Sequence, residues 1–178
     1  VTGLNHKTAP LLVREKLALI ATPEHDALGH LLKLSFVYEA VILSTCNRTE
    51  VYAETTHPEQ LIEWLARESD ITIDALMPHM YQHQDNQGVQ HLLRVASGLD
   101  SMMLGEPQIL GQLKQAYRAA DEKNAIQREL RHTFPFVFSA SKRIRNQSGI
   151  GNNPISVASA AVRLIGDFFT DYQALEVF

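Results

Sequence analysis

The hydrophobic periodicity of this chain changes near residue 84, and the change restricts the folds that the chain can adopt. Before that point, short runs rich in valine, isoleucine, threonine and tyrosine alternate with helical patterns. The strand-like runs cover residues 1–6, 40–45, 49–54 and 79–83. One helix is predicted to start at Thr22–Pro23–Glu24, and a second to cover about residues 58–68. The resulting order β-α-β-β-α-β is that of a ferredoxin-like unit. We therefore predict a ferredoxin-like α/β subdomain over residues 1–84.

The second half of the chain follows a helical period instead. A first helix is predicted by apolar residues at i, i+3, i+4 and i+7, namely Val89, Leu92, Leu93 and Ala96. Further helices are predicted from Pro107, over residues 127–146 and from Asn153–Pro154. Pro135 should kink the middle one of these or mark its true start. We therefore expect a helical subdomain over residues 85–150, and an α+β fold in which a ferredoxin-like βαββαβ sheet unit precedes a helical bundle.

Composition and charge exclude several classes of protein. The 178 residues carry a formal net charge of −4, which argues against a protein that coats nucleic acid by bulk charge. The single cysteine excludes an internal disulfide and a multi-thiolate zinc or iron–sulfur site. His79 and His83 do not form a metal site, because a strand would hold them too far apart and no third ligand is indicated. No run of about 18 apolar residues and no signal segment is present. We therefore expect no metal site, no membrane association and a cytoplasmic location.

The single cysteine, Cys46, lies between two predicted strands in the segment LSTCNRTEVY, among polar neighbours. A thiolate at this place suits acyl transfer, because a thioester remains reactive. Arg48 could lower the pKa of the thiol or hold a substrate carboxylate through two hydrogen bonds. His91, beside the apolar stripe of its helix, could act as an acid, a base or an orienting group. An inert thiol, a solvated arginine and a structural histidine would explain the same pattern.

A second candidate segment is GLDSMMLGEPQILGQLKQAY, residues 98–117. Its proline makes Glu106 the expected N-cap of the following helix, and Gln108 and Gln112 then share the face opposite the leucine stripe. Amide groups beside a helix N-terminus suit a polar or anionic substrate, although a well-capped surface helix fits the sequence as well. A basic cluster further along could contact phosphates or form a solvated face; it consists of Lys142, Arg143 and Arg145.

Nearly the whole chain resembles the N-terminal part of glutamyl-tRNA reductase. The similarity rests on four segments in the same order: GLNHKTAP, LSTCNRTEVY, HLLRVASGLDSMMLGEPQILGQLKQAY and SVASAAVRL. The resemblance implies NADPH-dependent reduction of glutamyl-tRNA(Glu) to glutamate-1-semialdehyde, in tetrapyrrole biosynthesis. It implies that Cys46 attacks the aminoacyl ester, that the tRNA leaves, and that a glutamyl thioester remains to be reduced.

The resemblance also implies roles for individual residues. Cys46 and His91 would be catalytic, with His91 positioning the substrate or polarising the thiol. Arg48 would hold the side-chain carboxylate of the glutamyl group. The residues expected to bind substrate are Thr45, Cys46, Asn47, Arg48, Ser101, Glu106, Pro107, Gln108 and Gln112.

The sequence departs from the family pattern at its C-terminal end. The family continues into a Rossmann domain with a glycine-rich loop, whereas this sequence ends at ALEVF and begins at Val1 without an initiator methionine. We expect residues 151–178 to be a linker helix and the start of a truncated NADPH-binding domain, so that no residue of this chain binds the cofactor. The homodimer expected of the full-length enzyme would form through a missing C-terminal domain.

Two other functions remain open on the sequence alone. A ferredoxin-like sheet can bind RNA through exposed aromatic side chains, for which Tyr52 and Tyr81 are the candidates. A thiol acyltransferase that acts on a free amino acid would also use Cys46. Acylation that depends on charged tRNA is expected only of a glutamyl-tRNA reductase.

Overall fold

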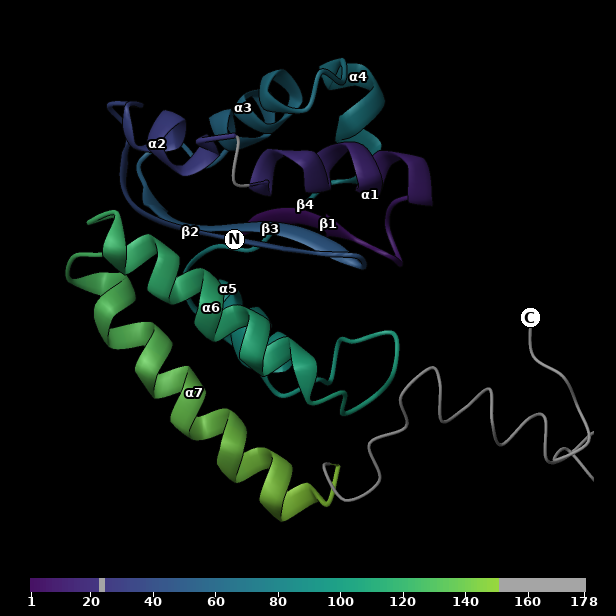
Figure 1. Ribbon diagram of the computed structural model, residues 1–178, viewed down its shortest axis with the longest axis vertical. Coiled ribbons are helices and arrows are strands. Elements are labelled where there is room, and N and C mark those ends of the chain that lie inside the picture. The colour runs from purple at the N-terminus through teal and green to yellow at the C-terminus, as the bar shows by residue number, and fades with distance from the viewer. Residues whose placement is uncertain (23–24, 151–178) are drawn as a thin grey trace, which may run out of the picture.

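An antiparallel four-stranded sheet lies between two layers of helices in the computed structural model, which describes residues 1–22 and 25–150 (Figure 1). The strand order is β2-β3-β1-β4, and each neighbouring pair is antiparallel. This order is the ferredoxin-like one, so the predicted α+β fold is confirmed. The strands are β1 (Thr2–Asn5), β2 (Val37–Thr45), β3 (Arg48–Thr55) and β4 (Tyr81–Gln82).

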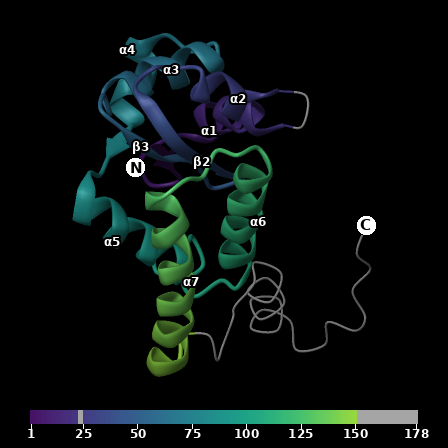
Figure 2. The same cartoon turned by 90° about the vertical axis from the view of Figure 1, so that its left-hand side faces the viewer.

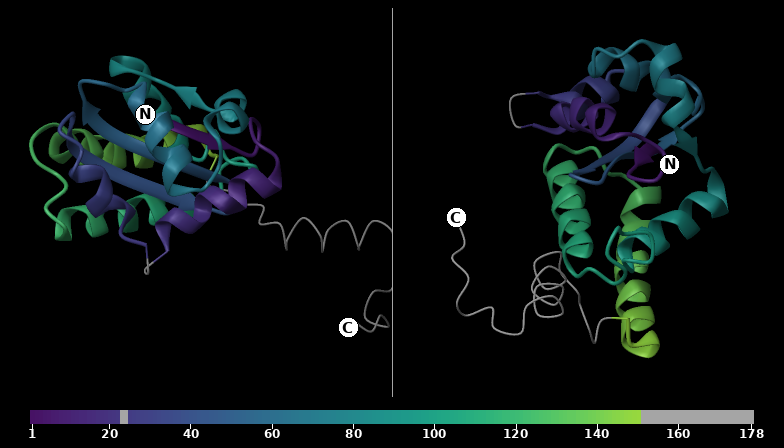
Figure 3. Two further views of the ribbon diagram at one scale, coloured as in Figure 1. Left: turned by 90° about the horizontal axis from the view of Figure 1, so that it is seen from above. Right: turned by 90° about the vertical axis from the view of Figure 1, so that its right-hand side faces the viewer.

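Each face of the sheet is covered by its own set of helices (Figures 1 and 2). The first layer contains α1 (Leu11–Ala18), η1 (Leu19–Ala21), α2 (Ala27–Leu32), α3 (Gln60–Glu68), α4 (Ile73–Leu76) and η2 (Met77–His79). The second layer contains α5 (Asp85–Ala96), α6 (Gln108–Glu122) and α7 (Glu129–Ser148). The right-hand view of Figure 3 shows the sheet between the two layers. Among the helices of the described residues, none is long and apolar enough to cross a membrane.

The sequence of β2 explains why helices cover both faces of the sheet. Successive side chains of a strand point to opposite faces. Ala40 and Ile42 belong to the apolar core under α1–α4, whereas Val41 and Leu43 belong to the core against α5–α7. Because both faces of this strand are apolar, both must be buried, and a single helical layer would leave one of them in water.

The start of α7 is fixed to the sheet by a buried carboxylate. Glu39, on β2, is 1% exposed and accepts hydrogen bonds from the backbone N–H groups of Gln127, Glu129 and Leu130 at 2.8–2.9 Å. Glu129 and Leu130 belong to the first turn of α7, whose N–H groups have no intrahelical partners, and Gln127 lies just before the N-cap. The negative charge also lies at the positive end of the helix dipole, so Glu39 determines where α7 meets the sheet.

Several element boundaries differ from the sequence expectation. No helix was predicted after Pro10, but this residue is the N-cap of α1. The helix expected from Thr22 begins instead at Ala27, where the side chain of Asp26 accepts a hydrogen bond from the backbone of Gly29, and Pro23 and Glu24 lie outside the described residues. Sequence patterns place helix ends poorly, because tertiary contacts decide which turn is retained.

In the second layer, α7 continues through Pro135, which therefore does not mark the start of the helix. The proline removes one intrahelical hydrogen bond without ending the helix. Val89 is 37% exposed, so the buried stripe of α5 runs through Leu92, Val95 and Ala96 rather than through Val89. The helix and the cofactor-domain start expected within 151–178 lie outside the described residues. The division of the chain into two subdomains at residue 84 stays a prediction.

Candidate active site

The thiol lies in the two-residue turn that joins β2 to β3. Thr45 and Arg48 form the last pair of the hairpin, and Cys46 and Asn47 connect them. The hydroxyl oxygen of Thr45 accepts hydrogen bonds from the backbone N–H groups of Asn47 and Arg48, both at 3.2 Å. Cys46 is exposed at this tip. The threonine therefore stabilises a turn that presents the thiol to solvent.

Two residues from the start of the chain hold this turn in place. Arg14, on α1, donates from Nη1 to the carbonyl oxygen of Cys46 at 2.7 Å and to Oδ1 of Asn47 at 3.2 Å. The backbone N–H of His6 donates to the carbonyl oxygen of Asn47 at 2.8 Å. Sequence reasoning missed Arg14 because it did not predict α1. The arginine brings a fixed positive charge beside the thiol-bearing turn.

The loop between α5 and α6 forms the opposite wall of the site. Gly98 (φ 76°) and Gly105 (φ 77°) have left-handed backbone conformations, which glycine adopts without strain, and the N–H of Gly105 donates to the carbonyl of Gly98 at 2.9 Å. Arg145, on α7, donates to the carbonyl oxygens of Ser97, Gly105 and Glu106 at 3.0–3.3 Å. Arg145 therefore holds the loop, whereas its basic neighbours 142 and 143 remain exposed.

These two walls enclose a small polar cavity of about 40 Å³. It is lined by Thr45, Cys46, Asn47, Arg48, Ser101, Met102, Glu106, Gln108, Ile109 and Gln112. Eight of the nine substrate-binding residues expected from the sequence are in this set; the ninth, Pro107, is the N-cap of α6 in place of Glu106. Ligand pockets typically have volumes of roughly 300 Å³ or more, so the cavity must widen to enclose a glutamyl group.

Arg48 is the most heavily paired side chain of the site. It is 2% exposed, and its Nη1 lies 2.8 Å from Oε1 of Glu50. Its Nη2 donates to the backbone carbonyl of Asp100 at 2.5 Å and to the Asp100 carboxylate at 3.3 Å. Lys7 adds a second cation, 2.5 Å from the other oxygen of Asp100. The charge of Arg48 is therefore balanced by two carboxylates, which the local sequence did not predict.

Glu50 connects this ion pair to the interior of the protein. Its carboxylate is fully buried and accepts hydrogen bonds from the hydroxyl groups of Tyr52 and Tyr81 and from Nε2 of His91, the last at 2.8 Å. Burial alone would favour the neutral acid, but the hydrogen bond from His91 and the charge of Arg48 outweigh it and lower the pKa of Glu50 to about 2. Glu50 is therefore ionised at neutral pH.

His91 lies behind the cavity rather than in its wall. The residues that line the cavity do not include it, and its side chain is 11% exposed and hydrogen-bonded to Glu50. Its ring stacks on that of His83, with centroids 4.7 Å apart. His91 therefore reaches the site through Glu50 and Arg48.

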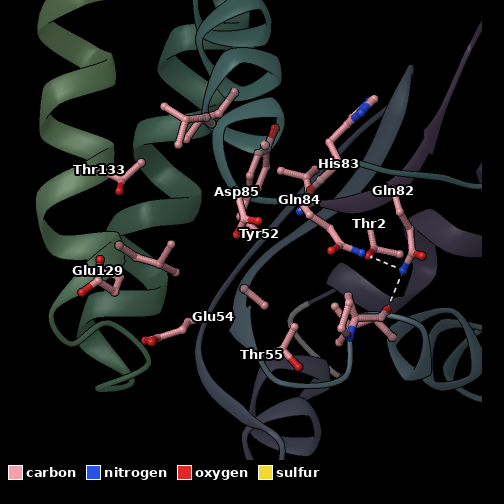
Figure 4. A pocket seen from close by; sticks show the side chains of 18 of the residues that line it. Thr2, Tyr52, Glu54, Thr55, Gln82, His83, Gln84, Asp85, Glu129 and Thr133 are labelled. Atoms are coloured by element: carbon pink, nitrogen blue, oxygen red, sulfur yellow. Dashed lines mark hydrogen bonds between the residues drawn. The ribbon is translucent and has the colours of Figure 1, made fainter.

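A roomier cavity of about 410 Å³ lies between the far end of β3 and the first turns of α5 and α7 (Figure 4). Three of the side chains that line it are the carboxylates Glu54, Asp85 and Glu129. It shares no lining residue with the cavity beside the thiol. Tyr52 connects the two cavities indirectly. It lines the larger one, and its hydroxyl donates to Glu50, which pairs with Arg48 in the wall of the smaller one.

The fold and the smaller cavity define a class of protein: an α+β domain with a ferredoxin-like sheet that presents an exposed thiol beside a polar pocket. Residues 2–148 match the family described as "Glutamyl-tRNAGlu reductase, N-terminal domain". Glutamyl-tRNA reductase of Legionella pneumophila (strain Corby) is 56% identical over 176 residues, which are 99% of this chain and 42% of that protein. That of Pseudomonas aeruginosa (strain PAO1) is 49% identical over 173 residues, 95% of this chain and 40% of that protein.

A solved structure agrees with the sequence comparison. Glutamyl-tRNA reductase from Methanopyrus kandleri matches 93% of this chain and 39% of its own, with a TM-score of 0.72 and 32% sequence identity. The chain therefore belongs to the glutamyl-tRNA reductase family. It spans about 42% of the length of the Legionella relative.

Proposed function

We propose that this chain supplies the substrate-binding and thioester-forming part of the NADPH-dependent reduction of glutamyl-tRNA(Glu) to glutamate-1-semialdehyde, in tetrapyrrole biosynthesis. The observation that supports the proposal is the convergence of one exposed thiol with amide, hydroxyl and charged groups from two distant segments in a single cavity. Family membership supports the same role. The cytoplasmic location and the homodimer of the full-length enzyme stay predictions from the resemblance.

In the proposed reaction, the Cys46 thiolate attacks the carbonyl carbon of the ester that joins glutamate to the tRNA. A carbon–sulfur bond forms, the ester carbon–oxygen bond breaks, and the ribose oxygen of the tRNA takes up a proton as it leaves. Arg48 would bind the side-chain carboxylate of the glutamyl group, and Glu106 would bind its α-ammonium group. Gln108 and Gln112 would supply amide donors at the helix start.

NADPH, when bound to the enzyme, supplies the hydride that reduces the thioester. The residues of 1–22 and 25–150 do not fit such a cofactor, because their sheet is antiparallel throughout and no glycine-rich loop joins a parallel strand to a helix there. The step that the described residues can perform is therefore formation of the thioester.

Mass spectrometry of the intact chain tests this proposal. Incubation with glutamyl-tRNA(Glu) should add one glutamyl group, and peptide mapping should place it on Cys46. Free glutamate with uncharged tRNA is the matched control and should leave the mass unchanged, whereas acylation by the free amino acid would support a general thiol acyltransferase. A chain that stays unmodified in both mixtures would contradict the proposal.

The RNA-binding alternative lacks its expected surface. Tyr52 is 2% exposed, and the hydroxyl groups of Tyr52 and Tyr81 both donate to the buried carboxylate of Glu50. Helices also cover both faces of the sheet (Figure 1). The two tyrosines therefore stabilise the charge network instead of forming a platform on which bases could stack.

We expect Arg48→Lys to weaken discrimination between glutamate and glutamine. Lysine keeps a positive charge beside Glu50 and Asp100 but cannot donate two parallel hydrogen bonds to a carboxylate. Truncation of one partner of such a charge pair typically costs about 2–5 kcal/mol of binding, and lysine, which keeps the charge, should lose part of that amount. The measurement is the rate of Cys46 acylation by glutamyl-tRNA and by glutaminyl-tRNA. A variant that rejects glutaminyl-tRNA as strongly as the wild-type chain would disprove the assignment of Arg48.

We expect His91→Ala to slow acylation by up to about 10²-fold, because Arg48 loses the support that reaches it through Glu50. The pH dependence of the Cys46 alkylation rate should stay unchanged, since His91 does not line the cavity. His83→Ala is the matched control, because His83 stacks on His91 but makes no hydrogen bond to Glu50 among the described contacts. A shifted alkylation profile in His91→Ala would instead indicate that the histidine acts on the thiol.

A further inference from the structure

Two histidines and one glutamate meet where α2 and α3 lie over the sheet, in a cluster that shares no residue with the thiol cavity. Nε2 of His25 lies 2.5 Å from Oε2 of Glu68, and Nδ1 of His30 lies 3.1 Å from the same oxygen. The two imidazole rings pack edge to face with centroids 5.5 Å apart. These residues are up to 43 positions apart and no local spacing connects them, so the sequence pattern predicted no metal site.

The carboxylate of Glu68 is the anchored member of this cluster. Its side chain is 15% exposed, against 35% for His25 and 45% for His30. Glu68 is the last residue of α3, where the helix dipole disfavours a negative charge and favours a nearby cation. In the part of the chain that the structure describes, the carboxylate pairs with these two imidazoles and with no lysine or arginine.

Two imidazole nitrogens and a carboxylate oxygen are a donor set that zinc and similar divalent transition metals prefer. We propose that His25, His30 and Glu68 bind one such ion, with water in the remaining position. All three candidate ligand atoms already lie within 4.8 Å of one another. Zinc bonds of about 2.0–2.2 Å place tetrahedral ligands about 3.3–3.5 Å apart. Each imidazole must therefore move away from Oε2 of Glu68 by about 1 Å or less, and the two imidazoles must adopt the same spacing from each other. The exposed imidazoles have room to make this movement.

The ion would join the segment before α2, α2 itself and the end of α3. These three segments come from the helical layer over one face of the sheet, and only the folded chain brings them together (Figure 1). Because the ion would bind the folded state and not the unfolded one, it should raise the thermal unfolding midpoint in a concentration-dependent way.

Isothermal titration of zinc chloride into the chain, without an affinity tag, tests the site. Every protein in the series carries Cys46→Ser, so that the thiol cannot bind zinc. One zinc ion should bind to the parent protein. The zinc affinity should fall at least about tenfold in His30→Ala and in Glu68→Gln, because replacing groups that only support metal ligands already reduces metal affinity by about this factor. Zinc should also raise the unfolding midpoint of the parent, and EDTA should reverse the increase.

His57→Ala is the matched control, because His57 forms an exposed pair with Glu59 at 3.1 Å but belongs to no cluster of three potential ligands among residues 1–22 and 25–150. This variant should bind zinc as the parent does, and circular dichroism should confirm that all variants are folded. Equal zinc affinity in the parent, His30→Ala and Glu68→Gln would overturn the proposal. Absence of zinc binding by the parent would overturn it as well.

Discussion

Incubated with glutamyl-tRNA(Glu) and NADPH, this chain should release glutamate and form no glutamate-1-semialdehyde. Under the proposed function, thioester formation needs only the Cys46 thiolate and a bound ester. Reduction needs a hydride donor held against the acyl carbon, for which residues 1–22 and 25–150 offer no site. Water should then hydrolyse the thioester slowly, so the chain should behave as a weak glutamyl-tRNA esterase whose rate is unaffected by NADPH.

Cys46→Ser is the control for that experiment. Serine is a far weaker nucleophile at neutral pH, and removal of a catalytic nucleophile typically slows a reaction by about 10³-fold or more. Glutamate release and the mass adduct should therefore both disappear. Deacylation that continues unchanged in Cys46→Ser would show that another group acts as the nucleophile, and semialdehyde formation by the wild-type chain would show that the chain does bind the cofactor productively.

Glu50→Gln should destabilise the fold by about 3–5 kcal/mol, the usual result of removing one partner from a buried ion pair. Glu50 is completely buried, and the change leaves the guanidinium of Arg48 with Asp100 as its remaining carboxylate among the described residues. Urea unfolding at neutral pH measures the effect. Glu63→Gln is the control, because the side chain of Glu63 is exposed on α3 and forms no ion pair among the described residues, and this change should alter stability by less than about 0.5 kcal/mol.

The same variant should alter the acid sensitivity of the protein. The pKa of Glu50 falls from 4.5 to about 2 on folding, so its charge stabilises the folded state above about pH 4.5. That stabilisation is lost as the pH falls towards 2, because the unfolded state takes up the proton first. The stability difference between wild type and Glu50→Gln should therefore be largest near neutral pH and shrink through this window. A difference that is independent of pH would mean that Glu50 is not ionised in the folded protein.

The sequence predicted those parts of the fold in which local pattern and tertiary structure agree. The apolar stripe of α3, with Leu61, Trp64 and Leu65, is buried as its helical spacing indicates. In contrast, α1 carries Leu11 and Leu12 on its exposed side and buries Leu17, so it has no continuous apolar stripe that periodicity could detect. Because Arg14 lies on this helix, its contact with the turn that carries Cys46 was not predicted either.

The candidate site shows the same limit. The resemblance named nearly all of the residues that line the cavity, but it did not name Glu50 or Asp100, which determine the state of Arg48. Arg48, Glu50 and Tyr52 alternate along one strand and therefore face the same side of the sheet, which is a signal that the sequence did contain. No local pattern could have identified Asp100, 52 positions away from Arg48.

By itself, the sequence determined the order of the four strands, the position of the single thiol at a strand end and the resemblance to one enzyme family. These properties depend on residues that are close together along the chain or on motifs in a fixed order. Tertiary structure alone decided which charges meet: Arg48 with Asp100, Glu50 with His91, and Glu68 with two histidines. The physical reason is that ion pairs and metal ligands depend on distances of a few ångströms in space, and those distances are set by how the helices pack on the sheet.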